Sequence, residues 1–73
     1  MDIREVFAVN LRKARRSKNL SQEELAHQAD IDRTYISALE RSIYAATIDV
    51  VAKLAVVLEV EASDLLKNPA PKQ

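Results

Sequence analysis

The stretch from Arg33 to Arg41 places two arginines and several small side chains on one side of an expected helix. Ile36 and Leu39 point the opposite way. At about 100° per residue, one arc of roughly 140° holds Arg33, Thr34, Ser37, Ala38 and Arg41. A guanidinium group can donate two hydrogen bonds to guanine, and the DNA major groove admits one helix. We therefore expect Arg33, Thr34, Ser37 and Ala38 to contact bases; the alternative is an ordinary solvated helix face.

Two short helices joined by a tight turn are expected to position this face. Ser21 and Glu24 form a capping-box pattern, in which each side chain can accept a hydrogen bond from the other residue's amide. Residues 30–31 make the turn, and Asp32 is a good N-cap for the second helix, which runs to about Arg41. We call this second helix the recognition helix.

Helical patterns also precede and follow this pair. Residues 3–18 carry apolar side chains at helical spacing, namely Ile3, Val6, Phe7, Leu11 and Ala14. Thr47 is an N-cap for a helix over 48–58, whose core side is expected to hold Ile48, Val51, Ala55 and Leu58. A last short helix falls within 60–67. The sequence predicts one all-α domain of five short helices over 1–67 and a disordered tail over 68–73.

Length and composition limit the class of protein. The 73 residues suit a single domain with one small core, since nearly half of them are apolar. There is no cysteine, and the charged N-terminus has no signal-peptide core. The longest apolar run, 54–58, is too short to span a membrane. We expect a cytoplasmic protein without a membrane partner, associated with the nucleoid when bound to DNA.

The charge balance argues against a non-specific nucleic-acid binder. Eleven basic and eleven acidic residues give a formal net charge of zero, whereas non-specific binding needs many phosphate contacts. Between Arg12 and Lys18 the chain has only basic charges. Such a local patch suits a sequence-specific binder with few phosphate contacts, although a basic run on a helix is more often a solvated face.

Enzymatic chemistry, metals and cofactors find no support in the sequence. His27 is the only histidine, and no cysteine is present to share a metal with it. The carboxylates within 23–32 lack a partner set for general acid–base catalysis. The absence of glycine argues against a phosphate-cradling loop. We expect no enzyme activity, no metal site, no cofactor and no small-molecule ligand.

The spacing of seven residues resembles the lambda-repressor-like, Cro/C1-type helix-turn-helix family of regulators. These residues are Gln22, Ala26, Ala29, Ile31, Ile36, Leu39 and Glu40. The segment 32–41 also resembles restriction–modification controller proteins, which are small, all-helical, dimeric regulators. The family usually has glycine in the turn where this chain has Asp30, which tolerates a left-handed conformation at a cost of ~1 kcal/mol. The loop 42–46 also differs from the polar loop that is common in the family.

The resemblance implies roles for residues outside the base-contact face. It implies that Gln22 contacts a phosphate and braces the recognition helix. It also implies an internal salt bridge between Arg15 and Glu40, which would fix geometry more surely than it adds stability. Core or dimer packing is an equal alternative for Tyr44. The expected contacts to the DNA backbone are Ser21, Gln22, Tyr35, Arg41, Ser42 and Tyr44.

The helix over 48–58 is apolar beyond the needs of one core. Val50, Leu54 and Val57 form a second stripe, roughly 100–150° from the first. We expect a second copy of the chain to cover this stripe; the alternative is burial within the chain. The expected function is transcription regulation by a homodimer on an inverted-repeat operator in double-stranded DNA, and the resemblance suggests a restriction–modification controller. The alternative is a protein-interaction module, such as a helix-turn-helix antitoxin that sequesters a partner protein.

Overall fold

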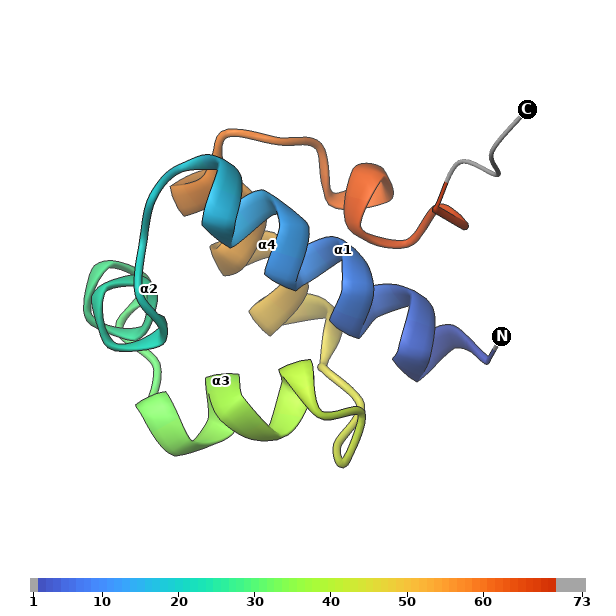
Figure 1. The fold of residues 1–73 in the computed structure, drawn as a ribbon, viewed down its shortest axis with the longest axis horizontal. Coiled ribbons are helices and arrows are strands. Elements are labelled where there is room, and N and C mark those ends of the chain that lie inside the picture. The colour runs from blue at the N-terminus through green and yellow to red at the C-terminus, as the bar shows by residue number, and fades with distance from the viewer. Residues whose placement is uncertain (1, 70–73) are drawn as a thin grey trace.

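The computed structural model describes residues 2–69 and consists of four α-helices and one 3-10 helix (Figure 1). They are α1 (Ile3–Ser17), α2 (Gln22–Ala29), α3 (Arg33–Glu40), α4 (Ile48–Leu58) and η1 (Ala62–Leu65). Residues 2–69 contain no strand. The all-α prediction is confirmed, and the last of the five helices is a single 3-10 turn.

Each α-helix begins at a side-chain cap. The hydroxyl groups of Ser21 and Thr47 accept the amide three residues on, and the carboxylate of Asp32 accepts the amide of Thr34. The predicted capping box is complete, because Glu24 N donates to Ser21 Oγ at 3.0 Å and Ser21 N donates to Glu24 Oε1 at 2.7 Å. These caps satisfy amides that have no partner within the helix, so local sequence sets where each helix starts.

The helix ends rely on left-handed residues, although the chain has no glycine. The residues with positive φ are Asn19 at 59°, Asp30 at 58°, Ser42 at 63° and Glu59 at 61°. At Asp30 the chain leaves α2, and the following amide of Ile31 donates to Ala26 O at 2.9 Å. The turn expected at this position is confirmed. An L-residue in this conformation costs roughly 1–2 kcal/mol, less for Asp and Asn.

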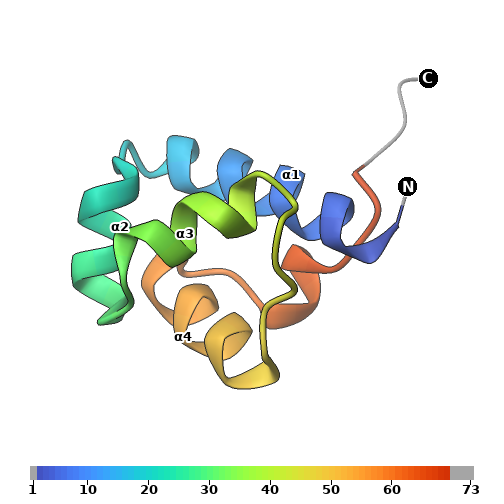
Figure 2. The same cartoon turned by 90° about the horizontal axis from the view of Figure 1, so that it is seen from below.

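All five elements contribute to one core. The fully buried side chains are Leu11, Leu25, Ile36, Leu39, Leu54, Leu58 and Leu65. Helix α3 packs against α1 and α2, and its other side is free of other helices (Figure 2). The chain directions of α1 and α3 are opposite, so the C-terminal half of α1 and the whole of α3 run side by side (Figure 1). Ile3 was expected on the core side of α1, but it is 57% exposed in the first turn.

The predicted dimer stripe on α4 is wrong in part. Leu54 is fully buried, because α2 and η1 both pack on the side of α4 that carries Leu54 and Leu58. Val50 and Val57 are half-buried against the core. Ile48, expected in the core, is 87% exposed at the start of α4. The exposed apolar side of α4 instead consists of Ile48, Ala52 and Val56.

No helix within residues 2–69 is long and apolar enough to cross a membrane. The disordered tail predicted over 68–73 lies mostly outside the described residues.

Glycine at the α2–α3 turn should stabilise the fold. Asp30→Gly removes the steric cost of a positive φ and a negative charge at the C-terminal end of α2, and we expect the free energy of unfolding to rise by about 0.5–1 kcal/mol. Urea denaturation measures the change. The matched control is Asp49→Gly in the first turn of α4, which should lower stability by about 1 kcal/mol. Equal losses in the free energy of unfolding for both variants would contradict the assignment of a left-handed conformation to Asp30.

Candidate nucleic-acid interface

The outward side of α3 presents few but suitable groups. Arg33 and Thr34 are exposed in the first turn, and Ser37 is half-buried one turn further on. Asp32 holds this turn, since its carboxylate accepts the Thr34 amide at 2.8 Å. The arrangement places an exposed guanidinium and an exposed hydroxyl group on neighbouring residues at the N-terminal end of α3. These are the group types that donate hydrogen bonds to base edges in the major groove.

Ala38 does not belong to this face. Its side chain is 7% exposed, so the prediction that it points outward is wrong. The chain after α3 folds back on this turn, and the amide of Ile43 donates to Ala38 O at 3.0 Å. A wheel drawn for α3 alone does not include this returning loop. The outward face is therefore narrower than expected: within α3 it consists of Arg33, Thr34 and Ser37, and Arg41 follows directly after the helix.

A buried carboxylate attaches α3 to the rest of the domain. Arg15 of α1 binds Glu40 through Nε–Oε2 at 2.6 Å and Nη2–Oε1 at 3.0 Å. Gln22 Nε2, at the start of α2, donates to the same Oε1 at 3.0 Å. The side chain of Glu40 is only 3% exposed. The salt bridge implied by the resemblance is present, and it joins all three helices at one point.

The positive charges around Glu40 keep it ionised. Burial alone would raise the pKa of Glu40, but hydrogen bonds from Arg15 and Gln22 and the charges of Arg15 and Arg12 outweigh burial and lower the pKa below its ordinary value. Arg15 also donates from Nη1 to Leu20 O at 2.8 Å, which fixes the guanidinium from its other side. The side-chain N and O atoms buried within residues 2–69 all have partners.

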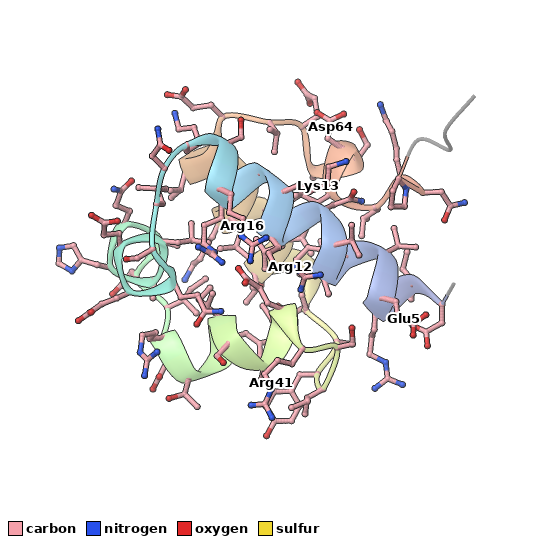
Figure 3. The ribbon with its side chains drawn as sticks, in the orientation of Figure 1. Glu5, Arg12, Lys13, Arg16, Arg41 and Asp64 are labelled. Atoms are coloured by element: carbon pink, nitrogen blue, oxygen red, sulfur yellow. The ribbon has the colours of Figure 1, made fainter. Side chains whose placement is uncertain are left out.

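Arg12 has a role that the sequence did not reveal. Its Nη1 donates to the main-chain oxygen of Glu40 at 2.7 Å, so it caps the C-terminal end of α3. Figure 3 shows Arg12 between α1 and α3 and Lys13 on the side of α1 away from α3. Lys18 pairs with Glu59 at 2.7 Å. Much of the basic run 12–18 is therefore used within the fold. A main-chain acceptor leaves no signal in the sequence, so this contact could not have been predicted.

The start of α2 combines a hydroxyl, an amide side chain and free main-chain N–H groups. Ser21 is exposed and Gln22 is half-buried. The structure directs Gln22 Nε2 to Glu40, so the predicted bracing of α3 is present. The N–H groups of the first helical turn have no partner within the helix and suit an anion.

Two tyrosines lie close together, Tyr35 in the first turn of α3 and Tyr44 in the loop after it. The ring centroids of Tyr35 and Tyr44 are 6.1 Å apart at 40°, and Tyr35 OH donates to Ala45 O at 3.4 Å. Tyr44 is 55% exposed, so it is not a core residue. Arg41 is exposed directly after α3 and Ser42 is half-buried in the left-handed conformation. The polar tips of this loop border the outward side of α3, where Figure 3 also places Arg41.

No group of three or more potential metal-ligating side chains occurs in the part of the chain that the structure describes.

The sequence profile of a helix-turn-helix family, HTH_3, matches residues 11–65. This range includes α2, α3 and both partners of the Arg15–Glu40 bridge. The chain belongs to this family, and it is a DNA-binding domain of the Cro/C1 type rather than an enzyme. Its fold is accordingly the lambda-repressor-like one.

Named relatives narrow the resemblance. A hypothetical transcription factor of Neisseria meningitidis serogroup B is 46% identical over 68 residues, which cover 93% of this chain and 64% of the relative. Its crystal structure superposes with a TM-score of 0.90. Control protein C.BamHI of Bacillus amyloliquefaciens is 42% identical over 66 residues, 89% of this chain and 82% of that protein. The restriction–modification controller C.AhdI of Aeromonas hydrophila has a TM-score of 0.82 at 35% identity, covering 85% and 94% of the two chains.

The Glu40 bridge should make stability depend on pH in the acid range. Because the folded pKa of Glu40 is lowered, its contribution is complete well above pH 4.5 and is lost as pH falls through 4.5 and the folded value. Glu40→Gln should cost about 3 kcal/mol at pH 7, since it leaves Arg15 without its counter-charge, and much less at pH 3. Urea denaturation at both pH values measures this difference.

The control is Glu59→Gln, which removes an exposed ion pair and should change stability little at either pH. A cost of Glu40→Gln that is the same at pH 7 and pH 3 would show that the ionised form of Glu40 is not what holds α3.

Proposed function

We propose that the chain is a sequence-specific transcription regulator that binds an operator in double-stranded DNA as a homodimer. The observation that carries this is the exposed first turn of α3, where Arg33 and Thr34 stand free while the other side of the helix is buried. In helix-turn-helix proteins, the second helix lies in the major groove and contacts base edges through its N-terminal residues. Acting on chromosomal DNA would place the protein in the cytoplasm.

Backbone contacts come from both sides of α3. The main-chain N–H groups at the start of α2, with Ser21 and Gln22, face one strand, and Arg41, Ser42 and Tyr44 face the other. Tyr35 of α3, whose ring lies beside that of Tyr44, adds a further backbone contact. Such contacts hold the reading helix in register but carry no sequence information. The zero net charge of the chain fits a protein that uses few of them.

The particular role we propose is control of restriction–modification genes. Its support is the similarity to C.BamHI over 89% of this chain and to C.SmaI of Serratia marcescens, 41% identical over 72 residues. Two observations test this role. One is whether restriction and methylation genes neighbour the gene of this chain, and the other is whether the protein changes the expression of a reporter placed behind that gene's promoter.

A second copy of the chain is the partner that fits the exposed side of α4. Ile48 is 87% exposed and Val56 is 76% exposed, with the small Ala52 one turn from each. A two-fold axis near Ala52 would bring Ile48 of one copy to Val56 of the other, and the alanine permits a close approach. This isologous surface replaces the one built on Leu54, and it relates two α3 helices by a dyad.

Arg33 should carry base discrimination. We expect Arg33→Ala to weaken binding to the selected operator by about 1–3 kcal/mol and to relax the preference at one base position per half-site. Fluorescence anisotropy with the operator and with single-base variants measures both effects. The control is Lys13→Ala, which removes a charge on the far side of α1 and should leave the base preference unchanged. Equal losses of Arg33→Ala on operator and random duplexes would place Arg33 on phosphate instead.

The α4 surface should control the oligomeric state. Val56→Glu puts a charge into the proposed interface, and we expect the weight-average mass in sedimentation to shift from dimer to monomer. Since Val56 is 76% exposed, the melting temperature of the monomer should show an intact fold. Ala62→Glu, on the exposed side of η1, is the control and should stay dimeric. A Val56→Glu protein that stays dimeric would rule out this surface.

A further inference from the structure

Arg4 is an exposed cation whose side chain has no polar partner among residues 2–69. Within residues 2–69 it takes part in no salt bridge and its side chain makes no hydrogen bond. It stands in the first turn of α1, where the helix dipole disfavours a positive charge by about 0.3–1 kcal/mol. The neighbouring acids Asp2 and Glu5 are engaged in the capping box of α1. The charge of Arg4 therefore has no stabilising partner within residues 2–69.

The helix geometry turns Arg4 toward the same side as the arginines that hold α3. At about 100° per residue, Arg4 falls within about 20° of Arg15, which binds Glu40. Arg12 touches the last residue of α3, and Arg4 lies eight residues before it, or about 12 Å along the axis. Because α1 and α3 run in opposite directions, the first turn of α1, which carries Arg4, lies beyond the C-terminal end of α3 (Figure 1).

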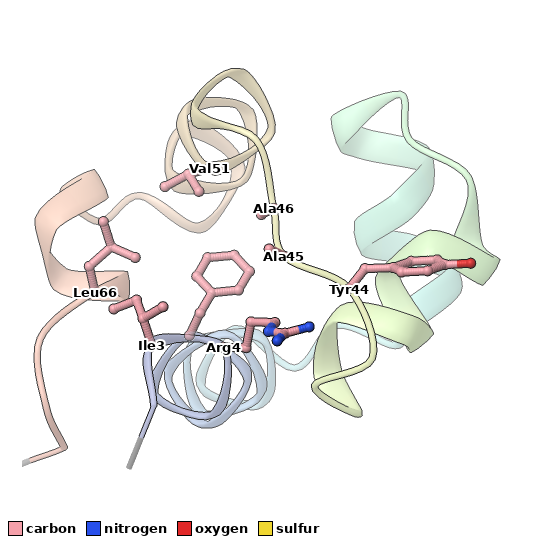
Figure 4. Close-up of a pocket in the computed structure, with 8 residues that line it drawn as sticks. Ile3, Arg4, Tyr44, Ala45, Ala46, Val51 and Leu66 are labelled. Carbon is pink, nitrogen blue, oxygen red and sulfur yellow. The ribbon is translucent and has the colours of Figure 1, made fainter.

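The loop after α3 occupies this same place. Arg4 and Tyr44 line one hollow, whose floor includes Phe7 and Val51. Figure 4 shows the Arg4 side chain extending from α1 toward the loop that carries Tyr44. Arg41, exposed at the end of α3, begins this loop. Two guanidinium groups and a phenol from two separate segments thus lie at one end of the reading face.

We propose that Arg4 contacts a DNA phosphate outside the base pairs read by α3 and extends the backbone contacts of Arg41 and Tyr44. The inference rests on the proposed function. Guanidinium groups bind phosphate with two hydrogen bonds, and each phosphate neutralised releases counterions. The DNA recognised by one subunit is therefore longer than the half-site that Arg33 and Thr34 read, and the extra length carries no base preference.

The salt dependence of binding tests Arg4 separately from sequence reading. The measurement is the slope of log K against log salt for two duplexes, the selected operator with ten flanking base pairs on each side and the same operator cut at the ends of its conserved bases. For Arg4→Ala on the long duplex we expect a slope reduced by about 0.9 per subunit. Arg4→Lys should restore it. On the short duplex wild type and Arg4→Ala should behave alike.

Lys13→Ala is the matched control, because Lys13 is also an exposed cation of α1 but lies about 180° around the helix from Arg4. It should leave both slopes unchanged, and the melting temperature of Arg4→Ala should not fall. A slope for Arg4→Ala equal to that of wild type on the long duplex would overturn the assignment while wild type still prefers its operator. Wild-type protein that prefers no duplex at all would contradict the proposed function instead.

Discussion

A single buried carboxylate, Glu40, decides how α3 is held. It lies in the last turn of α3 and receives hydrogen bonds from Arg15 of α1 and Gln22 of α2. Arg12 adds a contact to its main-chain oxygen. Desolvation offsets much of the attraction within a buried ion pair, so the value of the bridge is geometric. Because three helices meet at one ionised group, α3 cannot rotate or slide without leaving a buried charge unpaired.

This attachment from behind leaves the outward side of α3 free to vary. The face proposed to read bases consists of Arg33, Thr34 and Ser37, and none of their side chains belongs to the core. The arrangement also explains how a protein of zero net charge can bind DNA. Arg12 and Arg15 near the end of α1 are used inside the fold, and Lys18 pairs with Glu59, so part of the positive charge is not available to DNA. Selectivity then depends on a few well-positioned groups rather than on a large positive field.

Local features of the fold were predictable, and features that depend on neighbours were not. The caps at Ser21, Asp32 and Thr47 act within a few residues of their own position, so the helix starts followed from the sequence. The Arg15–Glu40 pair followed only from the family resemblance. Leu54 and Ala38 were placed on the wrong side, because packing by η1 and the returning loop 41–44 decides their burial. Helix periodicity describes one helix alone and gives no information about η1 or about the returning loop.

We propose that two α3 helices, each held by Glu40 and related by a dyad, read DNA bases. Selection of bound duplexes from random DNA by the wild-type protein is the decisive measurement. We expect enrichment of an inverted repeat with half-sites of about 3–5 base pairs, centred about 10–10.5 base pairs apart on one face of the duplex. Enrichment of no sequence, or of a single motif without two-fold symmetry, would contradict it.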